Sequence, residues 1–110
     1  MTVATGRWPE AEYQELLASE RHMFAWVLVR YGGVAQNRAE ELARERYPSE
    51  PADAPYRGHV FHDEAWHWGM LALRGEGYWV ADPSLESPPS EYRAEQQAWD
   101  ATDQDRQNSH

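Results

Sequence analysis

The chain has 110 residues, a length that suits one compact domain with a single core. It contains no Cys, which excludes disulfides, thiolate zinc sites and a cysteine nucleophile. Ten basic residues against nineteen acidic ones give a formal charge of −9. The average electric field of such a protein repels phosphate, and this disfavours direct nucleic-acid binding.

The sequence also bears on location and origin. No apolar run approaches the roughly 20 residues that a membrane helix needs, and residues 1–6 lack the features of a signal peptide. We therefore expect a cytoplasmic protein without a membrane segment. All ten basic residues are Arg, and both Lys and Ile are absent, as strongly GC-rich coding would produce. This pattern favours a bacterial or phage origin.

The composition favours helices. The chain has no Ile and six Val, so it is poor in the β-branched residues that suit strands, whereas Ala, Leu, Glu, Gln and Arg are plentiful. We predict an all-α fold in which residues 1–100 form a single domain of about four helices around an aromatic core. The polar residues 101–110 are expected to form a disordered tail.

Helix signals are clearest at the start of the chain. Apolar residues recur at helical spacing after Pro9, and the glycine pair 32–33 can end this first helix with a left-handed cap. A second helix is predicted over residues 35–47, where Pro48 stops it. Three prolines then predict an extended loop over residues 47–58.

Two structures compete for the segment 60–81. In the first, Asp63 caps a helix that ends at Gly75. In the second, strands over residues 66–73 and 78–81 form a hairpin that turns at residues 75–77, which would make the fold α+β. We favour the helix because its composition agrees with both of its caps. A last helix is predicted to follow Ser90, which caps it, and to end at about residue 99.

Three histidines lie close together in the sequence, at positions 59, 62 and 67, at the start of this segment. On a continuous helix, His59, Asp63 and His67 would lie along one face, with His62 beside them. Two imidazoles and one carboxylate form a ligand set for non-haem iron and for catalytic zinc. Our first expectation is that the chain has no cofactor and that these histidines are structural. The alternative is a divalent metal site, in a binding module or a metal-dependent enzyme, built from the four residues.

Two stretches of the sequence resemble the papain-like, bacteriocin-processing peptidase domains. Residues 25–33 with 38–42 are similar to the first helix and turn of that family, and residues 67–83 are similar to its histidine-bearing hairpin. The resemblance implies a cysteine at the start of the helix, and the corresponding position falls near Ser19. Because the chain has no Cys, the resemblance implies an inactive relative that lacks the thiolate nucleophile.

The last candidate site is a group of aromatic residues. Trp66, Trp68, Tyr78 and Trp79 lie close together in the sequence, and Trp and Tyr are the residues that most often anchor protein interfaces. The same rings would alternatively fill the core. We predict a non-enzymatic accessory or inhibitor-type protein that docks on another protein through this aromatic patch. Its acidic surface would compete for a basic face of the partner.

Overall fold

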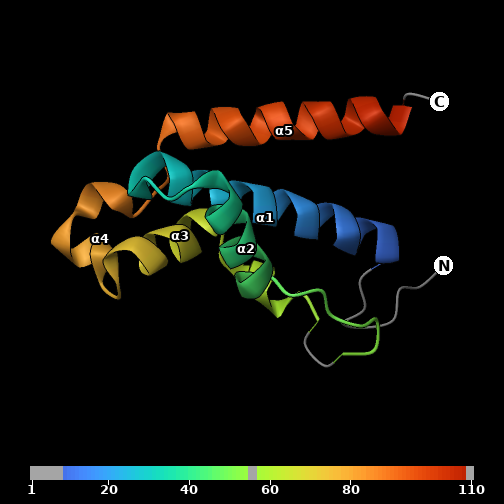
Figure 1. Cartoon of the computed structure of the whole chain (residues 1–110), viewed down its shortest axis with the longest axis horizontal. Coiled ribbons are helices and arrows are strands. Elements are labelled where there is room, and N and C mark those ends of the chain that lie inside the picture. The colour runs from blue at the N-terminus through green and yellow to red at the C-terminus, as the bar shows by residue number, and fades with distance from the viewer. Residues whose placement is uncertain (1–8, 55–56, 109–110) are drawn as a thin grey trace.

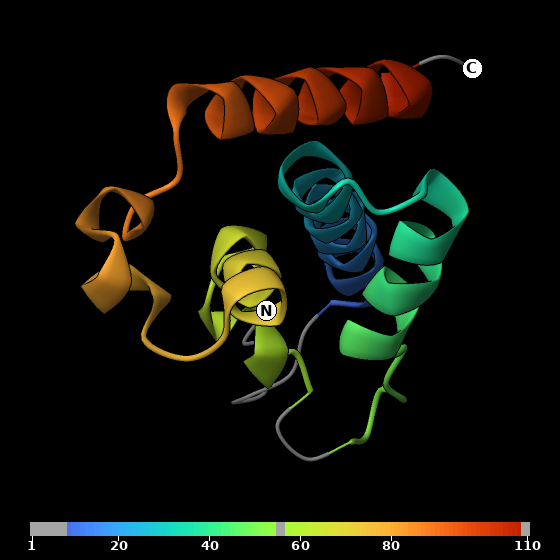
Figure 2. The ribbon, with the colours of Figure 1, turned by 60° about the vertical axis from the view of Figure 1, so that its left-hand side comes forward.

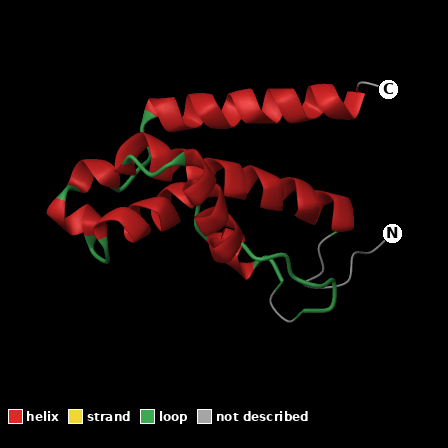
Figure 3. Ribbon diagram, in the orientation of Figure 1, coloured by secondary structure: helices red, strands yellow, loops and turns green. Residues whose placement is uncertain are grey.

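The structure is a computed structural model that describes residues 9–54 and 57–108, with side chains described as far as Thr102. Residues 1–8 of the predicted domain and 109–110 of the predicted tail lie outside the described residues. The described part contains five α-helices, two short 3-10 helices and no strand (Figure 3). This result confirms the predicted all-α class and contradicts the α+β alternative.

Helix α1, Glu10–Gly32, is the central element of the fold. It begins after Pro9 and ends before Gly33, whose φ of 65° forms the predicted left-handed cap. Glu10 and Glu12 lie in the first turn, where negative charge stabilises the positive end of a helix. The bounds predicted for this helix are therefore confirmed.

The other long helices pack around α1 and contact it directly (Figure 1). They are α2, Gln36–Arg46, α3, Ala65–Arg74, and α5, Ser90–Asn108. Figure 2 views α1 almost along its axis, with α2 and α3 on opposite sides of it and α5 above. Helix α5 runs antiparallel to α1 in Figure 1. The bounds predicted for the second helix are confirmed to within one residue.

The core between these helices is largely aromatic. Tyr13, Tyr47 and Tyr92 are fully buried, and their rings contact other aromatic rings around them. Helices α1 and α3 approach closely because Gly69 has no side chain. A Cβ atom at Gly69 would lie 2.6 Å from the Cγ1 atom of Val27.

Helix α3 does not begin where the sequence predicted. A 3-10 helix, η1, covers His59–His62, and Asp63 ends it in an extended conformation. The N-cap residue of α3 is Glu64, which makes no side-chain cap hydrogen bond, so the prediction that Asp63 caps this helix is wrong. Glu20 of α1 supplies the acceptor instead, because its carboxylate accepts a hydrogen bond from the backbone N–H of Ala65.

The hairpin alternative is wrong because the chain forms a second helix after the glycines. Gly75 ends α3, as the helical alternative predicted, and Gly77 with a φ of 76° leads into α4, Tyr78–Ala81. Another 3-10 helix, η2, follows at Pro83–Leu85. Trp66, Gly69 and Met70 are all buried in the core, and the step of three residues from Trp66 to Gly69 keeps one face in a helix but changes face in a strand.

Helix α5 begins at Ser90, the residue that was predicted to cap it, and continues to Asn108, into the range for which we expected a disordered tail. The sequence after Pro89 contains no Gly or Pro, so no residue in it breaks the helix. Ion pairs join the first half of α5 to the rest of the fold. They are Arg30 with Glu91, Arg93 with Glu64, and His22 with Glu95.

Over residues 9–54 and 57–108, no helix is both long and apolar enough to cross a membrane.

Candidate functional site

Apolar side chains project from the short helix α4. Trp79 retains 39% of its surface exposed and Val80 retains 75%, although both are large hydrophobic residues. Beside them lies a pocket of about 280 Å³ lined by His67, Tyr78, Trp79 and Glu86. We call Trp79, Val80 and the residues of this pocket the α4 surface.

The support of the α4 surface is rigid. Tyr78 is buried, and its hydroxyl shares a hydrogen bond of 3.0 Å with Nδ1 of His67. The ring of Tyr78 meets the ring of Trp79 edge-on, with centroids 5.0 Å apart. Burial raises the pKa of Tyr78, and the nearby carboxylates of Asp63 and Glu86 raise this pKa further. Tyr78 is therefore a neutral phenol that holds Trp79 in place.

Carboxylates border the α4 surface. A second pocket, of about 270 Å³, shares His67, Tyr78 and Glu86 with the first and extends to Asp63 and Glu64. Arg93 neutralises Glu64 through two hydrogen bonds from its guanidinium group. Within the described part of the chain, Asp63 and Glu86 have no ion-pair partner. The border therefore carries uncompensated negative charge.

The predicted aromatic patch is only partly present at this surface. Trp66 is 2% exposed, and its Nε1 donates to the carbonyl of Leu85 at 2.8 Å, so it belongs to the core. Trp68 is half-buried, because its Nε1 donates to Val60 and the guanidinium of Arg46 lies 3.8 Å from its ring centroid. Of the four predicted residues, Tyr78 and Trp79 line the pocket, and only Trp79 is exposed.

The sequence analysis missed two residues of the α4 surface, Val80 and Glu86. Val80 is the large apolar one. It lies in a helix of four residues between two turns, and so short an element has no apolar period from which an exposed side can be predicted. The sequence analysis did not assign Val80 to the core, but this alone does not indicate that the side chain is exposed or what it would contact.

Three of the four predicted metal ligands, His62, Asp63 and His67, line the second pocket, and His59 does not. Among the described residues, no group of three or more His, Asp or Glu side chains is placed to hold a metal ion. His59 and His62 stack on each other within η1, with ring centroids 6.2 Å apart, whereas His67 lies in α3. The predicted common face does not exist because the chain leaves helical geometry at Asp63.

The structure also departs from the peptidase resemblance. The segment expected to form a histidine-bearing hairpin is helical, as described above. Ser19 lies well inside α1 and not at its start, and it lines a pocket next to α5. His67 lines the pocket beside α4. The structure thus shows neither the hairpin nor the nucleophile position that the resemblance implies.

The α4 surface combines an exposed ring, an aliphatic side chain, a phenol–imidazole hydrogen bond and two unpaired carboxylates. His67 and Tyr78 share a hydrogen bond, and both side chains have a polar group that can bind a ligand. The exposed apolar atoms favour contact with another apolar surface, while the carboxylates favour a positively charged one. Comparisons with known protein families, with curated proteins and with solved structures find no match. The site is therefore interpreted from its own geometry.

Proposed function

We propose that the protein is a non-enzymatic accessory or inhibitor-type protein that docks on a basic face of another protein through the α4 surface. The observation that carries this proposal is the exposure of Trp79 and Val80 next to the unpaired carboxylates of Asp63 and Glu86. The proposed setting is the bacterial cytoplasm, in a protein of bacterial or phage origin.

The physical argument rests on how interfaces are stabilised. A Trp that is already held by its neighbours loses little conformational entropy on binding and contributes a large apolar area. Carboxylates around such an anchor select partners with positive surface charge and accelerate encounter with them. The formal charge of −9 of the whole molecule also attracts positively charged partners. A basic face that binds nucleic acid would meet both requirements, so the protein would compete with nucleic acid for it.

A capture experiment with quantitative detection tests the proposal. The wild-type protein and the Trp79→Ala variant are immobilised, exposed to bacterial lysate treated with nuclease, and washed at low and at moderate salt. We expect a protein with a basic surface to bind the wild type and to lose about 2 kcal/mol or more of binding free energy with Trp79→Ala. The difference corresponds to roughly a thirtyfold loss of affinity.

Two further variants make the capture experiment specific. Glu86→Gln should weaken the same complex and reduce its sensitivity to salt, because it removes one charge from the border. Trp99→Ala changes a half-buried Trp on α5 and serves as the matched control, which should retain the partner. Retention of every captured protein by a folded Trp79→Ala variant, or equal loss with Trp99→Ala, contradicts the proposal.

A further inference from the structure

Helix α5 is attached to the other helices by two sets of contacts that differ in their response to pH. The first set lies in its first turn, where Arg30 pairs with Glu91 and Arg93 pairs with Glu64. Arginine is not deprotonated in proteins, so neither pair is lost as pH rises. The side chains of both pairs are largely exposed, and exposed ion pairs contribute little to stability.

The second set lies one and two turns later and depends on a proton. Nε2 of His22 in α1 lies 2.7 Å from a carboxylate oxygen of Glu95, and the imidazole stacks on the indole of Trp99 with centroids 4.3 Å apart. The pair with Glu95 is an ion pair only while the imidazole is protonated. Deprotonation leaves a hydrogen bond between a neutral and a charged group, which is weaker. The other charged groups in the pocket that His22 lines are Arg21, Glu40 and Arg44.

A carboxyl group of α1 lies buried where α3 and α5 meet it. Glu20 is 6% exposed, and its carboxylate accepts a hydrogen bond from the backbone N–H of Ala65. The charges that act on it are the carboxylates of Glu64 at the start of α3 and of Asp100 in α5, and both oppose its ionisation. Among the described residues, no arginine or histidine forms an ion pair with Glu20.

Tyr92 connects this buried carboxyl group to α5. Its side chain is fully buried, and its hydroxyl lies within electrostatic reach of Glu20, as does the hydroxyl of Tyr47 after α2. Burial raises the pKa of both phenols, so they stay neutral and offset no negative charge on Glu20. An ionised Glu20 is thus a buried anion without a cation, and hydration by water would stabilise it.

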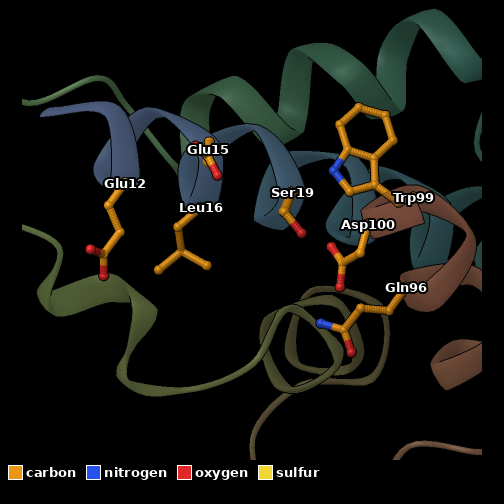
Figure 4. Close-up of a pocket in the computed structure, with 7 residues that line it drawn as sticks. All are labelled: Glu12, Glu15, Leu16, Ser19, Gln96, Trp99 and Asp100. Atoms are coloured by element: carbon orange, nitrogen blue, oxygen red, sulfur yellow. The ribbon is translucent and has the colours of Figure 1, made fainter. Parts of the chain in front are cut away.

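Helix α5 is the neighbour that can admit this water most easily. A pocket of about 310 Å³ separates its middle from the first half of α1 (Figure 4). Carboxylates of both helices, from Glu12, Glu15 and Asp100, line this pocket, and its described lining contains no basic side chain. Like charges repel each other across this gap, so separation of α5 relieves the repulsion. Helix α3, in contrast, packs closely on α1 at Gly69.

We propose that α5 is a pH-dependent arm that docks on α1 while Glu20 is neutral and His22 is charged, and that separates from α1 once both groups have lost their protons. Separation exposes the ring of Tyr92 and the sides of Trp26 and Trp66 that contact it. The proposal concerns the contact between α1 and α5, so it does not depend on the function proposed for the α4 surface.

Proton linkage gives the direction and the size of the effect. Burial raises the pKa of Glu20 to about 7 from an ordinary value of 4.5, and water around the separated helices restores the ordinary value. Between these values the separated state binds fewer protons than the docked state, so separation is favoured as pH rises. From about pH 5.5 to about pH 8.5, Glu20 alone increases the equilibrium constant for separation about thirtyfold. Deprotonation of His22 acts in the same direction, because it weakens the pair with Glu95.

Distances between spin labels, measured by double electron–electron resonance, test the proposal. The chain has no Cys, so cysteines for labelling can be introduced without removing any. Asn37→Cys with Ala101→Cys places labels at exposed positions of α2 and α5, and Asn37→Cys with Ala72→Cys places them on α2 and α3 as a reference. We expect the first pair to show a second, broader distance population whose ratio to the docked population rises about thirtyfold or more from pH 5.5 to 8.5. The reference distance should stay unchanged.

Variants in the labelled background identify the groups that are responsible. Glu20→Gln keeps an acceptor for Ala65 but cannot ionise, so the ratio of the two populations should change less than about threefold between the same pH values. His22→Gln keeps a hydrogen-bond donor without the charge, and it should increase the separated population at pH 5.5. Glu76→Gln removes an exposed carboxylate between α3 and α4 and should leave the response unchanged. No second population at pH 8.5, a full pH response in folded Glu20→Gln, or equal broadening of the reference pair overturns the proposal.

Discussion

The carboxyl group of Glu20 lies in the core, where residues of α1, α3 and α5 meet. Glu20 is 6% exposed, and burial raises its pKa to about 7 from an ordinary value of 4.5. The charges of Glu64 and Asp100 raise the pKa further, whereas the hydrogen bond from the N–H of Ala65 lowers it. The buried hydroxyls of Tyr47 and Tyr92 also lie within its electrostatic reach. Glu20 is therefore a group that titrates near neutral pH.

This pKa predicts how stability depends on pH. Between pH 4.5 and about 7, the folded protein retains a proton that Glu20 of the unfolded chain has already released. The free energy of unfolding therefore falls as pH rises through this window, by about 3 kcal/mol in total from this group. In the variant Glu20→Gln the amide oxygen can still accept from Ala65, but the titration is removed.

Urea unfolding at pH 5 and at pH 8 measures the effect. We expect the wild type to lose stability relative to Glu20→Gln between the two pH values, so that the comparison cancels the titration of all other groups. Parallel pH profiles for the two proteins would show that Glu20 ionises as an ordinary surface carboxylate.

The region of the α4 surface was predictable from the sequence, but the exposure of each tryptophan in it was not. The aromatic stretch around residues 66–79 was identified from the sequence, and it does contain the exposed ring of Trp79. Which ring is exposed was not predictable, because burial depends on partners far along the chain. The guanidinium group of Arg46 covers the ring of Trp68, and the backbone carbonyl of Leu85 accepts a hydrogen bond from the indole N–H of Trp66. Neither contact follows from a local pattern.

At the scale of elements, the contact between α1 and α3 depends on Gly69. Ala is the better helix former by about 1 kcal/mol, so Gly69→Ala would stabilise an isolated α3. In the folded protein the added Cβ would meet Val27, a buried and β-branched side chain that cannot easily turn away. We expect Gly69→Ala to destabilise the protein by about 1–3 kcal/mol, measured by urea unfolding.

A double-mutant cycle separates the clash from other effects. Val27→Ala alone should be destabilising, because it leaves a cavity in the core. In combination, Val27→Ala and Gly69→Ala should destabilise less than the sum of the single changes, because the smaller side chain leaves room for the added Cβ. Additive effects would show that the two helices do not meet through this pair.

Element boundaries were predictable wherever a local signal decides them. Gly33 ends α1 through its backbone conformation, and Pro48 follows the end of α2, so both ends agree with the sequence. The start of α3 and the end of α5 were predicted wrongly. The first depends on Glu20 of another helix, and the second lies in a polar segment in which neither Gly nor Pro breaks the helix. Only the start of α3 depends on a distant part of the chain, whereas the end of α5 follows the local rule that a helix continues where neither Gly nor Pro breaks it.

At the scale of the whole molecule, the excess of negative charge opposes folding. The described ion pairs on α2 are exposed, with more than half of each side chain accessible for Arg38 and Glu41. Such pairs contribute about 1 kcal/mol at most, whereas a formal charge of −9 repels itself throughout the compact state. Salt screens both effects, and we expect the repulsion to be the larger one.

Thermal unfolding followed by circular dichroism measures this balance. The Tm should rise when NaCl is increased from 20 to about 200 mM, over which the Debye length shortens several-fold. The double variant Glu15→Gln, Asp53→Asn removes two exposed negative charges that lie outside the first turn of α1, so its Tm should be higher at low salt and should rise less. A Tm that falls with salt would mean that the ion pairs outweigh the net charge.

The contact between Glu20 and Ala65 has a consequence for how the chain folds. Helix α3 has ten residues and no cap of its own, and helices of this length are marginal when isolated in water. The acceptor for its first turn lies on α1. We therefore expect the segment that carries the α4 surface to lose helical structure when it is separated from the longest helix.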